Sequence, residues 1–325
     1  CDQTENMKII LSLLFLGLAH EAFCVVDPTR FEAQSDIPPL APTSRNKFRM
    51  ADANELLRWR NATIVYQVAL PAYNDEELRG LREAMDIYEE ETCLKFKLAT
   101  KDDPYSAIIR KGSGGCNAIL GQAGTKGTQT VNLDYGCRYY GLFLHELGHT
   151  IGLHHEHQHP DRDQGVIINM DNVEPHMRVW FETIDRKKLN FYGVPYDMQS
   201  IMHYGQHAFA RYENNQALIS IKAKDPSKQR YLMYVYMKDL SFGDVKRINL
   251  MYKCNAHCPK IDCGDGFLNK HCKCETAKNF AQRRCFDKNT PEFCAKEKKN
   301  CNAHPSYMYT AFYNCRKTCN ACYEA

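Results

Sequence analysis

The chain has 325 residues and a formal net charge of +3, with 44% hydrophobic and 25% charged residues. These values are ordinary for a globular protein, and the length suggests two domains with accessory segments. Because the Lys and Arg residues are spread along the chain and form no stripe, the composition gives no support to nucleic-acid binding.

The N-terminal segment has the features of a secretory signal. Met7 and Lys8 precede a short apolar run at residues 9–19, and this order is typical of such signals, so we place one at residues 7–24. The run is too short to cross a bilayer, and a buried helix is the alternative. We expect residues 1–6 to be upstream translation and residues 25–49 to be a propeptide or linker. The product is expected to be secreted, extracellular and without a membrane span.

Residues 60–153 contain three predicted strands and two predicted helices. Short β-branched runs predict strands at residues 64–68, 107–109 and 130–133. Asn74 or Asp75 can cap a helix with one apolar face, formed by Leu78, Leu81, Ala84, Met85 and Tyr88. A second helix over residues 139–153 is apolar on most sides, and Gly152 is placed to end it. Residues 160–253 are mixed and irregular.

The second predicted helix carries a metal-binding pattern, because residues 145–155 read HELGHTIGLHH. His145 and His149 stand four residues apart, so both imidazoles lie on one helix face and can reach one metal ion. Glu146 is placed to reach a water on that metal rather than the metal itself. Gly152 can adopt a left-handed conformation that turns the chain and brings His155 back as a third ligand. Three neutral nitrogens leave one position open for water, as a catalytic zinc requires.

Three further histidines, His154, His157 and His159, crowd the same stretch. Only their spacing distinguishes them from the ligands, and we expect them to be exposed to solvent or to support the ligands. A buried helix that merely carries histidines is the alternative to the whole pattern. Five fixed residues at these offsets recur by chance in roughly one such chain in 10⁵ at average amino-acid usage.

The stretch from residue 145 to residue 163, which ends in HEHQHPDRD, resembles the signature of the astacin family of metalloendopeptidases, which are metzincins. Residues 200–204, SIMHY, are similar to the Met-turn of that family. The resemblance implies an α+β fold of two subdomains flanking a zinc cleft, with one Zn²⁺ per chain. It also implies that Met202 lies beneath the metal and that Tyr204 is a displaceable ligand that hydrogen-bonds the oxyanion.

The resemblance covers residues 50–254 as a catalytic domain and implies the disulfides Cys93–Cys254 and Cys116–Cys137. It implies that residues 127–133 form the edge strand against which an extended protein or peptide substrate pairs. The family usually has arginine where this chain has His159. Lys222 lies where some relatives place a basic residue facing the first substrate side chain after the scissile bond, and a solvated surface lysine is the alternative.

Latency is a further implication of the resemblance. Members of the family are made as zymogens, and Asp36 is our candidate for the propeptide carboxylate that occupies the water position. Cleavage after Arg49, or alternatively after Arg45, would expose a new amino terminus. In the family this group is buried against the glutamate next to the third histidine, here Glu156. Asn61 opens a glycosylation sequon.

Ten of the sixteen cysteines lie in residues 258–322. So dense a tail needs disulfides in place of an apolar core, which requires an oxidising compartment. Residues 285–322 resemble the ShK toxin-like module, whose connectivity implies Cys285–Cys322, Cys294–Cys315 and Cys301–Cys319, among the fifteen pairings that six cysteines allow. Residues 255–284 resemble a truncated EGF-like piece, and a zinc site is the alternative for its Cys258, Cys263, Cys272 and Cys274. We expect loops beyond Cys254 and possible substrate docking through both modules.

Two classes of function follow. The first is a secreted zinc endopeptidase with Glu146 as general base. The second is a catalytically silent binding protein or toxin whose cysteine-rich tail carries the function. An intact Glu146 and an open metal position favour the enzyme, because a closed structural zinc site needs neither.

Overall fold

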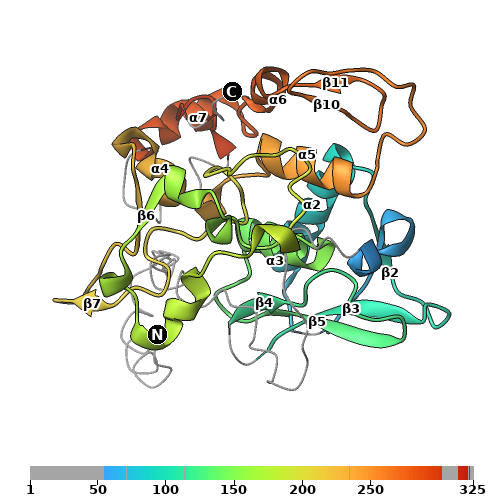
Figure 1. Cartoon of the computed structure of the whole chain (residues 1–325), viewed down its shortest axis with the longest axis horizontal. Helices are drawn as coiled ribbons and strands as arrows, with labels where there is room; N and C mark the ends of the chain where they lie inside the picture. The colour runs from blue at the N-terminus through green and yellow to red at the C-terminus, as the bar shows by residue number, and fades with distance from the viewer. Residues whose placement is uncertain are drawn as a thin grey trace, which may run out of the picture.

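The computed structural model describes residues 55–70, 72–112, 115–233, 235–301, 314–320 and 322. The expected signal and propeptide, with Asp36, Arg45 and Arg49, lie outside these ranges. The chain has an α+β fold built around one five-stranded sheet and two helices, followed by a less regular half and a disulfide-rich end (Figure 1).

The five-stranded sheet has the strand order β2-β1-β3-β5-β4. Its strands are β1 Thr63–Val68, β2 Lys95–Leu98, β3 Tyr105–Arg110, β4 Cys116–Ala118 and β5 Gly127–Leu133. The pairs β1–β2, β1–β3 and β3–β5 are parallel, and β4 alone runs antiparallel, with Ala118 opposite Val131. The strands predicted at residues 64–68, 107–109 and 130–133 are therefore confirmed.

The prediction that residues 127–133 form the edge strand is wrong. Strand β5 lies inside the sheet, between β3 and β4, and β4 forms the edge. A strand of three residues is too short to show a period of two in the sequence, which is why β4 was not predicted.

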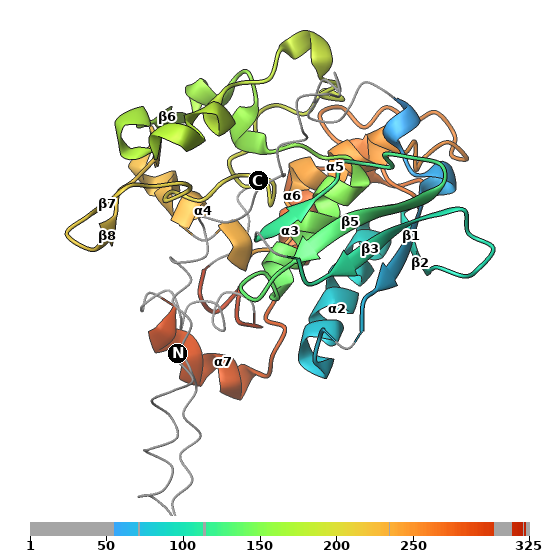
Figure 2. The same ribbon diagram turned by 90° about the horizontal axis from the view of Figure 1, so that it is seen from below.

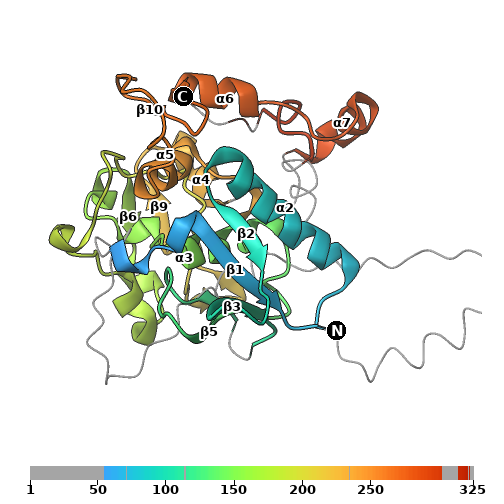
Figure 3. The ribbon, with the colours of Figure 1, turned by 90° about the vertical axis from the view of Figure 1, so that its right-hand side faces the viewer.

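Two helices lie on the same side of this sheet and pack against each other, α2 Asp75–Glu91 and α3 Tyr140–Ile151 (Figure 3). Asn74 is the N-cap of α2, and it forms a capping box with Glu77, in which each side chain accepts from the other's backbone N–H at 2.8 Å. Helix α3 is buried along its whole length. Gly152 follows it with φ of +117°, a left-handed conformation that ends the helix as the sequence predicts.

The second half of the chain has its own, smaller apolar core. Its regular elements are β6 Val166–Ile168, β7 Tyr212–Glu213, β8 Gln216–Ala217, β9 Ile221–Ala223, α4 Gln229–Met233 and α5 Phe242–Met251. Figure 2 shows β6, β7 and β8 on one side of α3 and the large sheet on the other. The first core contains α2, α3 and the sheet, whereas the second contains Phe181, Tyr204 and Phe209.

The C-terminal end is more regular than the sequence suggests. It contains β10 Phe267–Leu268, β11 Cys274–Glu275, α6 Ala277–Arg284 and α7 Pro291–Glu297, so the expectation of loops alone beyond Cys254 is wrong. These elements lie together along one side of the molecule, next to α5 (Figure 1). Thr276 and Thr290 cap the two helices through their side chains, and such caps are local signals that the sequence does contain.

Seven disulfides staple the described residues, and five of them join the pairs that the family resemblance implies: Cys93–Cys254, Cys116–Cys137, Cys285–Cys322, Cys294–Cys315 and Cys301–Cys319. The other two are Cys258–Cys272 and Cys263–Cys274. None of the helices in the described ranges could span a bilayer.

A buried ionic network ties the C-terminal end to the rest of the protein. The carboxylate of Asp239, which is fully buried, accepts hydrogen bonds from Tyr140 of α3, Arg284 and Arg316. Glu91 at the end of α2 accepts from Arg284 as well. A buried carboxylate is tolerated only when it is paired and hydrogen-bonded, so these contacts fix the C-terminal end against the helices of the first core.

Candidate metal centre and active site

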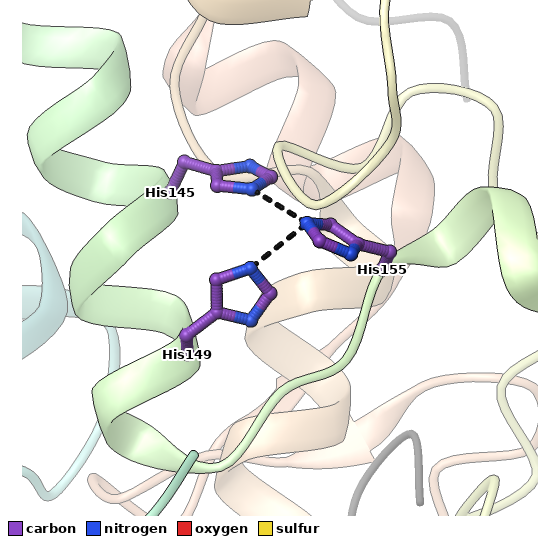
Figure 4. Close-up of side chains that lie close together, drawn as sticks. All are labelled: His145, His149 and His155. Atoms are coloured by element: carbon purple, nitrogen blue, oxygen red, sulfur yellow. Dashed lines mark hydrogen bonds between the residues drawn. The ribbon is translucent and has the colours of Figure 1, made fainter. Parts of the chain in front are cut away.

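Three buried imidazoles converge beside the C-terminal half of α3. The Nε2 atom of His155 lies 3.1 Å from that of His145 and 2.9 Å from that of His149. Figure 4 shows His145 and His149 projecting from one face of the helix and His155 facing them from the segment beyond its end. The bend at Gly152 makes this possible, because a continuous helix would carry His155 away from the other two.

The outer nitrogens of two of these rings are held by backbone carbonyls. His145 Nδ1 lies 2.8 Å from the carbonyl oxygen of Ile201, and His149 Nδ1 lies 2.7 Å from that of Leu153. A carbonyl can only accept, so each Nδ1 carries the proton and each Nε2 presents its lone pair to the centre. Such support of the outer nitrogen orients metal-binding histidines and fixes their tautomer.

Burial keeps these imidazoles neutral. It lowers the pKa of His145 to about 4, and together with the neighbouring histidines it holds the pKa values of His149 and His155 well below their usual range. Neutral imidazole is the form that binds a metal ion. Three Nε2 atoms that meet, two of them with their lone pairs directed inward, fit a shared cation, and a set of three nitrogens is the ligand set of catalytic zinc.

A second group near the C-terminus, His257 with Cys258 and Cys272, has ligand atoms equally close together. Its two sulfurs form a disulfide with each other, so neither is available as a thiolate. The group therefore does not fit a metal ion.

The Met-turn residues support the metal site from below α3. Met202 is fully buried. Its carbonyl oxygen accepts a hydrogen bond at 2.8 Å from the backbone N–H of Glu156, the residue directly after the third histidine. The backbone of Gly148, between the two helical histidines, passes close to the Met202 side chain, since a Cβ at this position would lie 2.4 Å from Met202 Sδ. Any residue larger than glycine at position 148 therefore requires the Met202 side chain to move.

Replacing Gly148 by alanine tests this close approach. The added methyl group would also meet the Tyr88 hydroxyl at 3.1 Å, so the buried Met202 side chain has to shift. We expect a loss of about 1–3 kcal/mol in the free energy of unfolding, the usual cost of overpacking, measured by denaturant titration with the disulfides intact. Gly80→Ala, whose methyl group would lie 3.2 Å from the ring of Phe143, is the control and should cost less. An equal cost for both would contradict the special role of position 148.

Glu146 and Tyr204 both lie in this buried region. Glu146 follows His145 on α3 and is 1% exposed. The ring of Tyr204 lies 4.4 Å from that of His155, centroid to centroid, and 3.8 Å from that of His157, to which it is nearly parallel. Tyr204 therefore belongs to the second apolar core, and it also contacts His155, which lies with the two histidines of α3 in the first half of the fold.

Of the two roles expected for His154, His157 and His159, exposure to solvent is wrong, because all three are at most 2% exposed. Support of the neighbouring ligands stays a prediction. His157 stacks on Tyr204, and His159 packs on Phe191 and accepts from the backbone N–H of Asp161 at 3.0 Å. Burial lowers the pKa of His159 to about 4. At the position where the family resemblance implies arginine, this chain therefore has a neutral imidazole.

Glu156 is held by partners that the sequence analysis did not identify. Its carboxylate accepts from Arg247 Nη1 at 2.8 Å and from the Asp197 backbone N–H at 2.9 Å, and the charged side chains of Glu156 and Arg247 are both buried. Burial, together with the nearby Asp244 and Glu156 carboxylates, raises the pKa of Asp197 to about 6. A basic residue seven positions before Cys254 was visible in the sequence, but nothing there marked it as the partner of Glu156.

The two remaining predicted residues are on the surface. Lys222 is the exposed central residue of β9, with its neighbours Ile221 and Ala223 buried. Asn61 is exposed and has φ of +52°, a conformation that asparagine tolerates.

Comparisons with known proteins agree with this geometry. The model of the astacin peptidase family matches residues 51–253. The chain is 36% identical over 202 residues to zinc metalloproteinase nas-14 of Caenorhabditis elegans, covering 61% of this chain and 38% of that protein. It is 34% identical over 252 residues to astacin-like metalloprotease toxin 2 of Loxosceles intermedia, covering 76% and 94%. This chain spans only part of its nematode relatives. The matches cover 38% of nas-14, 48% of nas-7 and 56% of nas-6.

Among solved structures, the fold is similar to that of high choriolytic enzyme 1, a hatching-enzyme zinc protease from Oryzias latipes. The TM-score is 0.51 at 30% identity, and the match covers 60% of this chain and 92% of that one.

Proposed function

Since the chain belongs to the astacin family of zinc peptidases, we propose that His145, His149 and His155 hold its one catalytic zinc ion and that it is an endopeptidase acting on extracellular proteins. The observation that carries this proposal is the convergence of three Nε2 atoms, with that of His155 2.9 and 3.1 Å from the other two, beside the residue expected to be the base.

The proposed chemistry divides between the metal and two side chains. When bound, zinc supplies a Lewis acid that lowers the pKa of water to about 7 and polarises the scissile carbonyl. Glu146 takes the proton of the attacking water and delivers it to the leaving amine. Tyr204 donates a hydrogen bond to the oxyanion that develops on the substrate. Burial of both side chains excludes bulk water and strengthens these interactions.

The test is hydrolysis of casein or gelatin by the purified, processed protein. We expect activity that a chelator abolishes and that zinc restores, together with one zinc per chain by metal analysis. Hydrolysis that is indifferent to chelation, or a purified protein that contains no metal, would refute the proposal.

An extended substrate is proposed to pair with the outer edge of β4, Cys116–Ala118. This strand is the antiparallel edge of the sheet, and the Cys116–Cys137 disulfide connects it to the segment that leads into α3. Main-chain pairing to a sheet edge is a recurrent way of binding extended peptides regardless of their sequence.

Lys222 is proposed to favour an acidic side chain directly after the scissile bond. Its exposed position on β9 leaves the ammonium available to a ligand, and an exposed ion pair corresponds to about a 2- to 5-fold preference. Lys222→Ala should therefore lower kcat/KM by about that factor for peptides with Asp at this position and leave the matched Ala peptides unchanged. Equal effects on both peptides would contradict this role of Lys222. The control is Lys224→Ala, a substitution of the neighbouring exposed lysine.

Secretion and latency are proposed from the sequence: a signal at residues 7–24, a propeptide at residues 25–49, and Asp36 as its inhibitory carboxylate. After cleavage, the new amino terminus is proposed to reach the buried acidic group of Glu156 and Asp197. Glu156 already has Arg247 as a partner, and the raised pKa of Asp197 reflects a buried carboxylate among like charges, which a cation would relieve. Sequencing the N-terminus of the active form identifies the cleavage site.

The C-terminal residues are proposed to form an EGF-like remnant at 255–284 and a ShK-like domain at 285–322, able to assist substrate docking. The three disulfides of the second segment support this assignment. Asn61, exposed near the start of the catalytic domain, is proposed to be glycosylated.

A further inference from the structure

The ring of Tyr204 lies in an aromatic slot, which is formed by His155, His157, Phe181 and Phe209, and it stacks on the ring of His157. The two rings are nearly parallel, with an interplanar angle of 17° and a centroid separation of 3.8 Å. The rings of Phe181 and Phe209 meet Tyr204 edge-on, at 6.2 and 5.5 Å. His155, the third imidazole of the metal centre, contacts Tyr204 at 4.4 Å. The phenol is therefore held between a metal ligand and a histidine two residues further along the chain.

His157 is itself fixed in place. Its Nε2 lies 2.9 Å from the carbonyl oxygen of Trp180, and its own carbonyl accepts from Arg162 Nη1 at 2.8 Å. The side chain is fully buried, and its ring also contacts Phe181 at 5.6 Å. A ring anchored through both backbone and side chain can set the position of a neighbour that stacks on it.

We propose that His157 is a positioning residue for Tyr204, whose imidazole face sets where the phenol stands beside the metal and hence how readily its hydroxyl reaches the oxyanion. The inference rests on the proposed function, because it concerns the same hydrolytic site. Phe181 and Phe209 set the sides of the slot. Among the described rings around Tyr204, only His157 offers a parallel face, so the stack is the contact that controls sliding and tilting of the ring.

The decisive experiment is a double-mutant cycle between His157→Gln and Tyr204→Phe, measured on kcat with a fluorogenic peptide. Glutamine keeps a donor for the Trp180 carbonyl but has no aromatic face, and phenylalanine at 204 keeps the ring but has no hydroxyl. We expect His157→Gln to lower kcat about 10-fold in the parent and less than about 2-fold in the Tyr204→Phe background. A purely structural role would lower kcat equally in both.

Two further variants make the result specific. His157→Phe keeps the stacking face and loses the bond to Trp180, so its kcat should stay within about 3-fold of the parent. His154→Gln changes another buried histidine beside His155 and should show no coupling with Tyr204→Phe. Zinc content and thermal midpoint are measured for every variant.

The outcomes separate the two proposals. A parent protein without peptidase activity would refute the proposed function. An active parent in which His157→Gln acts equally in both backgrounds, or in which His157→Phe is as damaging as His157→Gln, would refute the positioning role alone. Loss of zinc from both His157 variants would do the same, because His157 would then support the metal ligands rather than Tyr204.

Discussion

Replacing Glu146 by glutamine is expected to leave zinc bound and to lower kcat about 10²- to 10⁴-fold, the usual contribution of a general acid–base group. Glutamine has nearly the same shape as glutamate, so the buried site keeps its packing. The three imidazoles proposed to bind the metal are unchanged, and the outer nitrogens of His145 and His149 are held by backbone carbonyls and not by Glu146. What is lost is the group able to take a proton from water and return it to the amine.

The measurement pairs metal analysis with kcat on one peptide. Glu76→Gln, an exposed carboxylate in the first turn of α2, is the matched control and should leave both quantities unchanged. A Glu146→Gln enzyme with a full complement of zinc and kcat within about 10-fold of the parent would remove Glu146 from the mechanism.

Replacing Arg247 by methionine is expected to destabilise the protein by about 3–5 kcal/mol, because it removes the guanidinium that pairs with the buried charge of Glu156. The two side chains are 3% and 0% exposed, and their atoms approach to 2.8 Å. Methionine has a similar length and replaces the packing but not the charge. Since Glu156 follows His155 directly, we also expect zinc to bind more weakly.

Denaturant unfolding with intact disulfides measures the loss. Two variants serve as controls. Arg82→Met breaks the more exposed pairs with Asp86 and Glu89 and should cost less than about 1 kcal/mol. Adding Glu156→Gln to Arg247→Met removes the unpaired charge and should recover part of the stability. A cost for Arg247→Met no larger than that of Arg82→Met would contradict the importance of the buried pair.

Much of the first half of the fold follows from local patterns. The cap at Asn74, the apolar face of α2 and the β-branched runs of β1, β3 and β5 are short-range features, and the structure confirms all of them. The position of β5 within the sheet depends instead on its pairing with β4, and no pattern in either strand encodes that. The helices α6 and α7 span only eight and seven residues, which is too short for an apolar period to stand out between the cysteines, so their caps alone did not predict them.

The same distinction holds at the site. The convergence of the three histidines is predictable because four-residue spacing and a glycine bend act within eleven residues of sequence. By contrast, Arg247 lies 91 residues from Glu156, and Tyr204 reaches His157 only because two separate cores meet there. The burial of His154, His157 and His159 follows from the same meeting of cores, so it could not be read from a polar stretch of sequence.

The Cys93–Cys254 disulfide spans 161 residues and joins the end of α2 to the end of the matched family region, whereas Cys116–Cys137 spans 21. During synthesis both cysteines of the short bridge emerge long before Cys254. The long bridge has to wait until Cys254, directly after that region, has emerged, so Cys93 is without its native partner in the meantime. Oxidation of this region in strict order of appearance would join Cys93 to Cys116, and productive maturation therefore depends on folding that separates these two sulfurs first.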